Sequence, residues 1–112
     1  MEKLPISITP DMIEQANQTH KKVEAFELFD SENNSLGFAL FGRPSSNVIA
    51  GFERYVDKDS FKARGILING SVCLKEQKDI INSWEKNSEE YAAAFDAASK
   101  MLPVGKAEAK KV

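Results

Sequence analysis

The spacing of apolar residues changes several times along the chain, and each change predicts a new element. Residues 1–8 are expected to form a flexible leader. A helix should then begin at Thr9 with Pro10 in its first turn, because a threonine cap and an early proline suit a helix N-terminus. The apolar stripe of this helix is thin and consists of Met12, Ile13 and Ala16. We therefore predict a short, peripheral helix that ends near His20.

Two strand-like runs follow this helix. Residues 23–30 and 36–41 have the length and residue types of strands, and residues 31–35 between them are polar turn formers. This pattern predicts a β-hairpin. Because a lone hairpin is marginally stable in water, it must pack against helices or pair with another strand. Two readings stay open at this point, a hairpin covered by helices and a hairpin with an exposed edge.

Helical spacing predicts the next part of the chain. After a break at residues 42–45, apolar residues recur every three or four positions up to about Asp57. Polar capping residues then begin a third helix, whose apolar stripe continues to Leu74. Glycine costs up to about 1 kcal/mol relative to alanine inside a helix. We therefore expect a close helix–helix approach at Gly65 and a bend or break at Asn69-Gly70.

Two further helical segments complete the pattern. A short apolar stripe at residues 80–84 follows a wholly polar stretch. Asn87 is expected to cap the last helix, with Glu90 in the capping-box position and Pro103 ending it. Residues 105–112 are expected to be disordered because they are polar and lack apolar anchors.

Length and composition are those of one small domain. The chain has 112 residues, of which 42% are hydrophobic and 29% charged. We predict an α+β protein, in which an N-terminal helix and a β-hairpin are followed by a compact bundle of three to four helices, in a single domain over residues 9–104. The N-terminus lacks a signal-like apolar core, no segment is long enough to span a membrane, and a single cysteine forms no internal disulfide. We therefore expect a cytoplasmic protein.

The charge balance gives little support to nucleic-acid binding. The formal net charge is −2, with 15 basic and 17 acidic residues, whereas nucleic-acid binders usually carry a basic patch. The lysines within residues 106–111 are typical of a solvated tail. One alternative stays open, a small regulatory or nucleic-acid-associated protein of a mobile element, with helices at 43–74 that offer Lys58, Lys62 and Arg64 to phosphates.

The residue types that carry catalysis or bind metals are sparse and scattered. His20 is the single histidine and stands beside Lys21 and Lys22, whose positive charges disfavour an imidazolium, so a solvated surface position is expected. Cys73 lies at the end of an apolar stripe, which is typical of a packed thiol. Capping explains the paired carboxylates at two helix starts. The pair in the hairpin loop lacks the glycine and the terminal glutamate of a calcium loop, and the glycines of the chain form no phosphate-binding loop. We therefore predict no enzyme activity, no cofactor and no metal site.

The remaining candidate function is contact with another protein. The hairpin carries more apolar side chains than one buried face requires, which favours an exposed patch or strand edge. A tryptophan can anchor an interface, although it more often packs in a core. The predicted partner-binding residues are Phe26, Leu28, Phe38, Phe41, Arg43 and Trp84. We expect a protein partner, no membrane association, and self-association to form a homo-oligomer when that partner is absent.

The order of these features resembles a known family. The matching segments are the hairpin at 23–41, the junction at 42–45 that leads into 47–50, the stretch at 57–74, and the last helix at 90–102. Taken together they resemble the small tail-assembly chaperone-like proteins of tailed phages and prophages. The resemblance implies a non-catalytic protein that keeps the tail tube or tape-measure protein soluble during tail assembly in the host cell cytoplasm.

Overall fold

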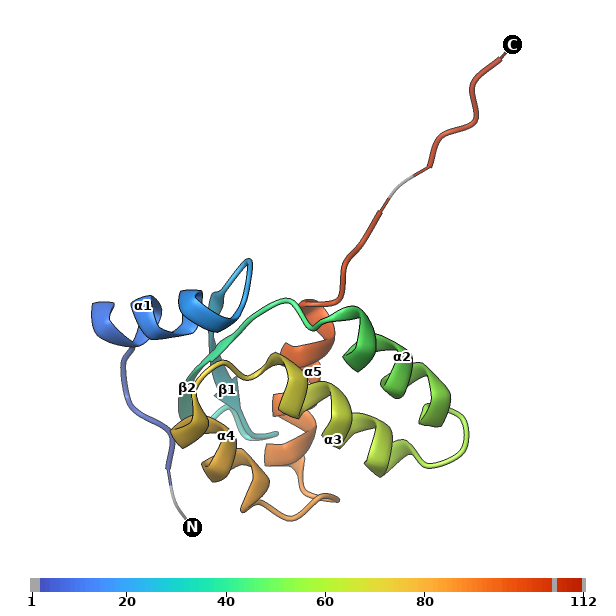
Figure 1. The fold of residues 1–112 in the computed structure, drawn as a ribbon. Helices are drawn as coiled ribbons and strands as arrows, with labels where there is room; N and C mark the ends of the chain where they lie inside the picture. The colour runs from blue at the N-terminus through green and yellow to red at the C-terminus, as the bar shows by residue number, and fades with distance from the viewer. Residues whose placement is uncertain (1–2, 106, 112) are drawn as a thin grey trace.

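The computed structural model describes residues 3–105 and 107–111, and within them it has five helices and two strands (Figure 1). In chain order these elements are α1 (Pro10–Thr19), β1 (Glu24–Phe29), β2 (Ser35–Phe41), α2 (Ser46–Tyr55), α3 (Ser60–Ser71), α4 (Lys75–Asn82) and α5 (Glu89–Lys100). The predicted α+β class is confirmed, with an N-terminal helix and a hairpin preceding the other helices.

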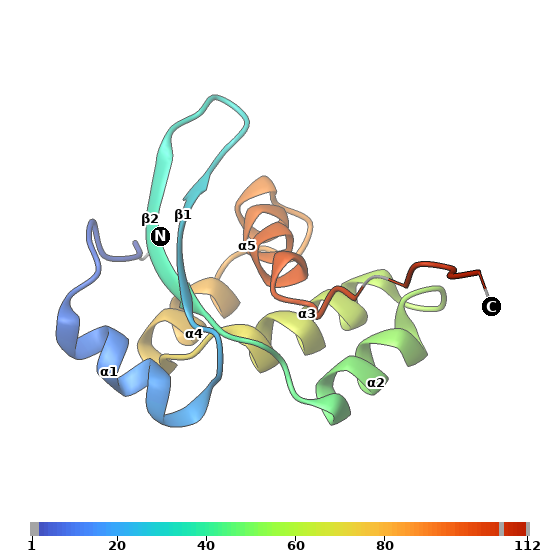
Figure 2. The same cartoon turned by 90° about the horizontal axis from the view of Figure 1, so that it is seen from above.

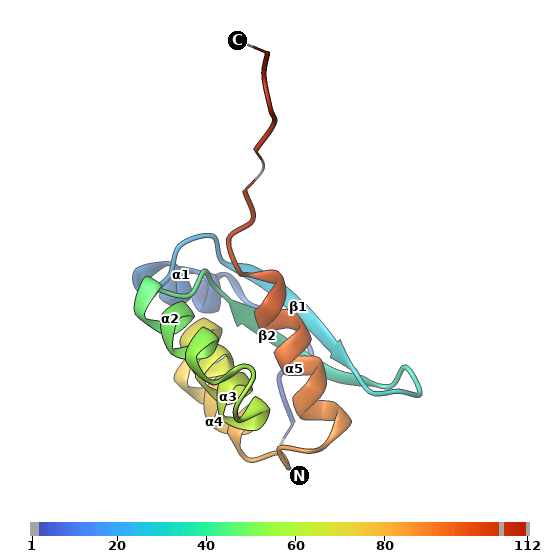
Figure 3. The ribbon, with the colours of Figure 1, turned by 90° about the vertical axis from the view of Figure 1, so that its right-hand side faces the viewer.

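The hairpin lies between α1 and α5. Figure 2 shows α1 on one side of the hairpin and α5 on the other, with α2 and α3 lying side by side. In Figure 3, α5 runs along β1, and the turn of the hairpin projects beyond the helices. The described residues after α5 form no helix or strand and lead away from the rest of the chain, while residues 106 and 112 of the predicted disordered tail lie outside the described residues.

The two strands pair in an antiparallel register with one irregularity. Glu24 lies opposite Phe41 and Leu28 lies opposite Gly37, but Phe29 lies opposite Ser35, so β2 has one extra residue near its start. A β-bulge of this kind bends the strand that carries it. The turn is closed by Asp30, whose Oδ1 accepts hydrogen bonds from the backbone N–H groups of residues 32 and 34, each at 2.9 Å. The Asn34 N–H bond lowers the pKa of the Asp30 carboxyl.

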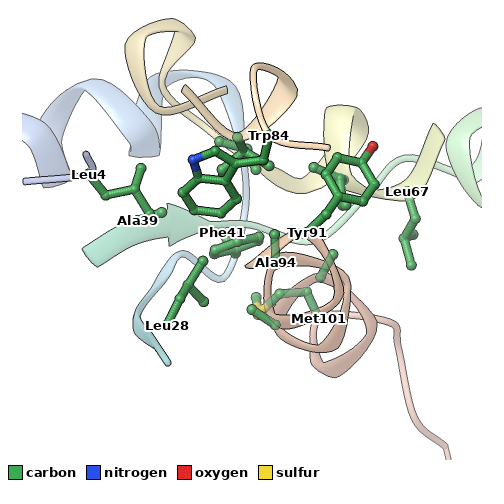
Figure 4. Close-up of a cluster of buried hydrophobic side chains, with 14 residues drawn as sticks. Leu4, Leu28, Ala39, Phe41, Leu67, Trp84, Tyr91, Ala94 and Met101 are labelled. Carbon is green, nitrogen blue, oxygen red and sulfur yellow. The ribbon is translucent and has the colours of Figure 1, made fainter. Parts of the chain in front are cut away.

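One face of the hairpin packs on α5 and forms the centre of the core. Phe26 and Phe41 meet edge to face, with ring centroids 5.4 Å apart. Figure 4 shows Phe41 and Leu28 next to side chains of α5, with Trp84 and Leu4 on the other side of the cluster. The main buried side chains are Leu4, Leu28, Ala39, Phe41, Leu67, Trp84, Tyr91, Ala94 and Met101. Phe26 and Leu28 therefore share the face of the hairpin that packs on α5.

The edge of β2 that faces away from β1 is hydrogen-bonded to segments far apart in the sequence. Its four bonds join Phe38 N–H to Pro5 O at 2.8 Å, Leu40 N–H to Gln77 Oε1 at 2.8 Å, Cys73 N–H to Leu40 O at 3.0 Å, and Gly42 N–H to Ser71 O at 2.8 Å. Gln77 is only 2% exposed, although the polar stretch around it gives no sign of burial. β2 is therefore an inner strand, and β1 is the open edge of the sheet.

The N-terminal segment differs from the flexible leader predicted for residues 1–8. Leu4 is 3% exposed and belongs to the core. Gly37 has φ +99°, and a Cβ at this position would lie 2.7 Å from the Leu4 carbonyl oxygen. The glycine therefore lets the Leu4 backbone approach β2 closely, next to the Pro5 bond. Residues 1–2 lie outside the described residues.

Helix ends agree with the sequence in part. Thr9 Oγ1 accepts the Met12 N–H at 3.3 Å, as a cap of α1 should. Residue 87 does not cap α5, because Ser88 Oγ accepts the Tyr91 N–H at 3.1 Å and the helix begins one residue later than that prediction requires. Both residue types are good caps, so local sequence does not separate them.

The predicted break at Asn69-Gly70 is wrong, because α3 continues to Ser71. A Cβ at Gly70 would lie 2.6 Å from Val48 Cγ2. The glycine is therefore a point of close approach between α3 and α2. Gly65, where close approach was expected, has more space, since a Cβ there would be 3.4 Å from the Tyr91 hydroxyl oxygen.

Gly70→Ala should destabilise the protein by about 1–3 kcal/mol, because the added methyl overlaps Val48 in a packed interface. Gly51→Ala in α2 is the matched control, since its Cβ would stand 3.4 Å from Ile66 and alanine favours a helix by about 0.5–1 kcal/mol over glycine. Urea unfolding followed by circular dichroism measures both changes. Equal stability of the two variants would contradict the close approach.

Candidate functional site

The six predicted partner-binding residues divide into core and surface groups. Leu28, Phe41 and Trp84 are buried, so their side chains mainly support the fold. Phe26 and Phe38 are half-buried, and Arg43 is exposed. The hairpin residues of the buried group are covered because α5 packs on their face of the hairpin. The sequence alone did not determine whether a helix would cover that face. Two of the six, Phe26 and Leu28, line one surface hollow together.

That hollow is a groove between β1 and α5, which we call the β1–α5 groove. Its apolar lining consists of Phe26, Leu28, Phe29, Ala92, Ala93 and Ala97. The α5 wall of the groove is shallow, because the side chains of its three alanines end at Cβ. Phe29 is 44% exposed and stands at the end of the groove toward the hairpin turn. The groove therefore offers an apolar surface that the chain itself leaves accessible.

Charged residues of mostly one sign surround the β1–α5 groove. The groove is lined by the carboxylates of Glu27, Asp30, Glu89 and Asp96 and by the ammonium of Lys100. Lys100 Nζ lies 3.0 Å from Asp96 Oδ2, so the single cation is already paired within α5. Three carboxylates remain without such an ion pair among the described residues. The groove is therefore acidic and favours a cationic partner.

An open strand edge runs beside the groove. In an antiparallel pair, residues that do not exchange hydrogen bonds with each other turn their N–H and C=O groups outward. The Phe38 and Leu40 N–H groups point away from β1, so their opposite residues, Glu27 and Ala25, also turn theirs away from β2. Within the described residues no backbone or side-chain hydrogen bond from outside the hairpin reaches these groups. β1 therefore has an edge that can pair with another strand.

The residues on the α5 side of this groove were not predicted from the sequence. The run from 91 to 98 contains five alanines, which signals a helix that allows close approach on more than one face. Glu89 was explained as a helix-start residue, which its place in the first turn of α5 allows, and Asp96 was not considered. No residue pattern in or near β1 predicts that its edge is open. Which strand has the open edge depends on the distant segments that pair with β2.

His20 and Cys73 both have structural surroundings. His20 is half-buried and not solvated as expected, with Nε2 3.0 Å from the Gly70 carbonyl oxygen and Nδ1 2.9 Å from Thr19 Oγ1. Because a carbonyl oxygen only accepts, His20 Nε2 carries a hydrogen and donates a hydrogen bond to the Gly70 carbonyl oxygen. Cys73 lies in a second groove lined by α1 and α4 residues, and burial raises the pKa of its thiol to about 11. Neither side chain is therefore set up as a nucleophile or a base.

The described residues contain no group of three or more histidine, cysteine, aspartate or glutamate side chains placed to hold a metal ion. Among them, too, no helix has the length and apolar character that a membrane crossing requires. Comparisons with protein-family models, curated proteins and solved structures found no match for this chain. The argument for function therefore depends on the groove and the strand edge described above.

Phe41→Ala should lower the free energy of unfolding by about 3–5 kcal/mol, because the ring is 0% exposed and its loss leaves a cavity in the core. Phe29→Ala, in the same hairpin but half exposed, should cost about 1 kcal/mol or less. Urea unfolding of the two variants tests the division into core and surface residues. A small loss for Phe41→Ala would show that its ring is not part of the core.

The Cys73 thiol should react slowly with iodoacetamide in the folded protein. Only the thiolate attacks, and a pKa of about 11 leaves far less of it at mildly alkaline pH than a free cysteine has. The alkylation rate should therefore be on the order of 100-fold below that of a free thiol. It should still rise with pH in the range where the alkylation rate of free cysteine no longer changes. Mass spectrometry of the alkylated protein follows the rate, and the same protein unfolded in urea serves as the control.

Proposed function

We propose that the protein is a non-catalytic protein-binding module that belongs with the tail-assembly chaperone-like proteins of tailed phages and prophages. In this proposal it binds the tail tube or tape-measure protein in the host cytoplasm and keeps that protein soluble until the tail assembles. The observation that carries the binding part is the acidic, apolar β1–α5 groove beside the open edge of β1. The phage part depends on the order of sequence features that resembles this family.

The groove suits reversible binding. An assembly chaperone has to cover apolar surface of its client and then release it, which requires contact area without a chemical reaction. A shallow apolar surface with a charged rim gives moderate affinity, because the rim charges stay partly solvated. Electrostatic attraction by the rim accelerates encounter with a cationic client and weakens at high salt.

The nucleic-acid alternative has less support from the geometry. Lys62 Nζ lies 4.1 Å from the centre of the Tyr55 ring, and the Arg64 guanidinium lies 5.1 Å from the centre of the Phe95 ring. Two of the three phosphate contacts of that alternative, Lys62 and Arg64, therefore stand over aromatic rings, and Lys58 is the third. The largest single-sign cluster described above is acidic, which repels a phosphate backbone.

Co-expression with the tail tube and tape-measure proteins encoded by the same genome tests the proposal. One of the two should become more soluble and should co-elute with this protein in gel filtration. Ala93→Arg, which fills the apolar groove with a large side chain, should abolish co-elution. Glu53→Arg adds the same side chain at an exposed α2 position and should leave co-elution intact.

Thermal unfolding of both variants checks that each is folded. The proposal is wrong if neither tail protein gains solubility and neither co-elutes. If a tail protein co-elutes equally with both variants, the client binds elsewhere and the β1–α5 groove is not the site.

A further inference from the structure

The backbone conformation of the bound segment follows from the hydrogen-bonding groups of β1 that have no partner. Ala25 and Glu27 each turn an N–H and a C=O group toward the open side of the sheet, while the opposite edge, on β2, is already paired. A helix laid in the groove would leave these four groups without protein partners, but an extended segment beside β1 would pair with them. The edge and the groove therefore favour an extended occupant.

The charges of the site indicate which side chains such a segment carries. In a strand beside β1, alternate side chains point to the two faces of the sheet. One set shares the face of Phe26 and Leu28 and enters the β1–α5 groove, where apolar residues fit. The other set shares the face of Ala25 and Glu27, where a basic residue opposite Glu27 would pair with its carboxylate.

We propose that an extended segment of a partner protein, with alternating apolar and basic residues, adds to the open edge of β1 as a third strand and places its apolar side chains in the β1–α5 groove. This inference rests on the proposed function, because it specifies how the client is held. The sheet then has the order partner–β1–β2, and the backbone bonds supply affinity that does not depend on one client sequence.

A second copy of the chain fits this edge less well. Two copies joined through β1 would bring both Glu27 side chains, and the acidic rims of both grooves, into one interface. Like charges that face each other across strands are destabilising. Glu27 repels a second copy and attracts a basic client strand, and the negative charge of the rim as a whole acts in the same direction.

Short fluorescein-labelled peptides test the inference on the full chain. The probe is a peptide of alternating valine and lysine. One comparison peptide alternates valine and glutamate, and another has the valines and lysines in two separate blocks. In fluorescence anisotropy titrations the alternating lysine peptide should bind at least about tenfold more tightly than either comparison peptide, with weaker binding at high salt.

Ala25→Pro is the decisive variant. Proline removes the outward N–H of residue 25, and an edge strand tolerates proline where that N–H faces solvent, so the hairpin should stay folded. The variant should bind the alternating lysine peptide about tenfold more weakly, whereas Ala25→Thr, which keeps the N–H, should bind within about twofold of the original protein. Glu27→Lys gives a second test, because it should weaken the lysine peptide and strengthen the glutamate peptide.

Three results would overturn the inference. The first is equal binding by Ala25→Pro and Ala25→Thr, and the second is equal binding of the alternating and block peptides. The third is a dimer in sedimentation equilibrium that Ala25→Pro dissociates, because the occupant would then be a second copy. If any of these occurs while a tail protein still co-elutes with the unmodified chain, the inference of strand addition is wrong and the proposed function is retained. If co-elution is absent as well, both are lost.

Discussion

The hydrogen bonds along the outer edge of β2 decide the architecture of this protein. A two-stranded hairpin has two open edges, and here one of them is closed by Pro5, Gln77 and the chain at Ser71–Cys73. These bonds join the N-terminal segment, the end of α3 and the start of α4 to one strand. They also leave β1 as the only open edge of the hairpin in the described part of the chain. Closure of the core and exposure of the candidate site therefore have the same physical origin.

The second constraint is the shape of α5. Its alanines allow the helix to lie close to the hairpin, so that Phe41 and Leu28 become core residues. Small alanine side chains on the outer side of α5 leave one wall of the groove shallow. Nearby carboxylates give the groove a negative charge. One helix therefore covers most of the apolar face of the hairpin and leaves a limited part of that face for a partner.

Local pattern was sufficient to predict the hairpin, the presence of the helices and the cap at Thr9, because each depends on residues near in sequence. It placed the fourth helix at residues 80–84, whereas α4 spans Lys75–Asn82 and includes the polar stretch. It failed where distant segments decide the outcome. Gln77 in a polar stretch is buried because its amide oxygen accepts the Leu40 N–H, and Leu4 is buried because Gly37 leaves it room. For the site, the sequence identified Phe26 but placed Trp84 and Phe41 on an interface, since hydrophobicity alone does not say which face a helix will cover.

The packing of α2 has a consequence for the dynamics of the molecule. Within α2 no residue is fully buried, and the helix is held by half-buried contacts such as Phe52 against Phe95, with ring centroids 6.1 Å apart. Segments with little buried apolar surface open locally at a lower free-energy cost than the core. The amide protons of α2 should therefore exchange with solvent deuterium well before those of α5. Opening of α2 would expose the Val48 side of Gly70 while the hairpin and α5 remain folded.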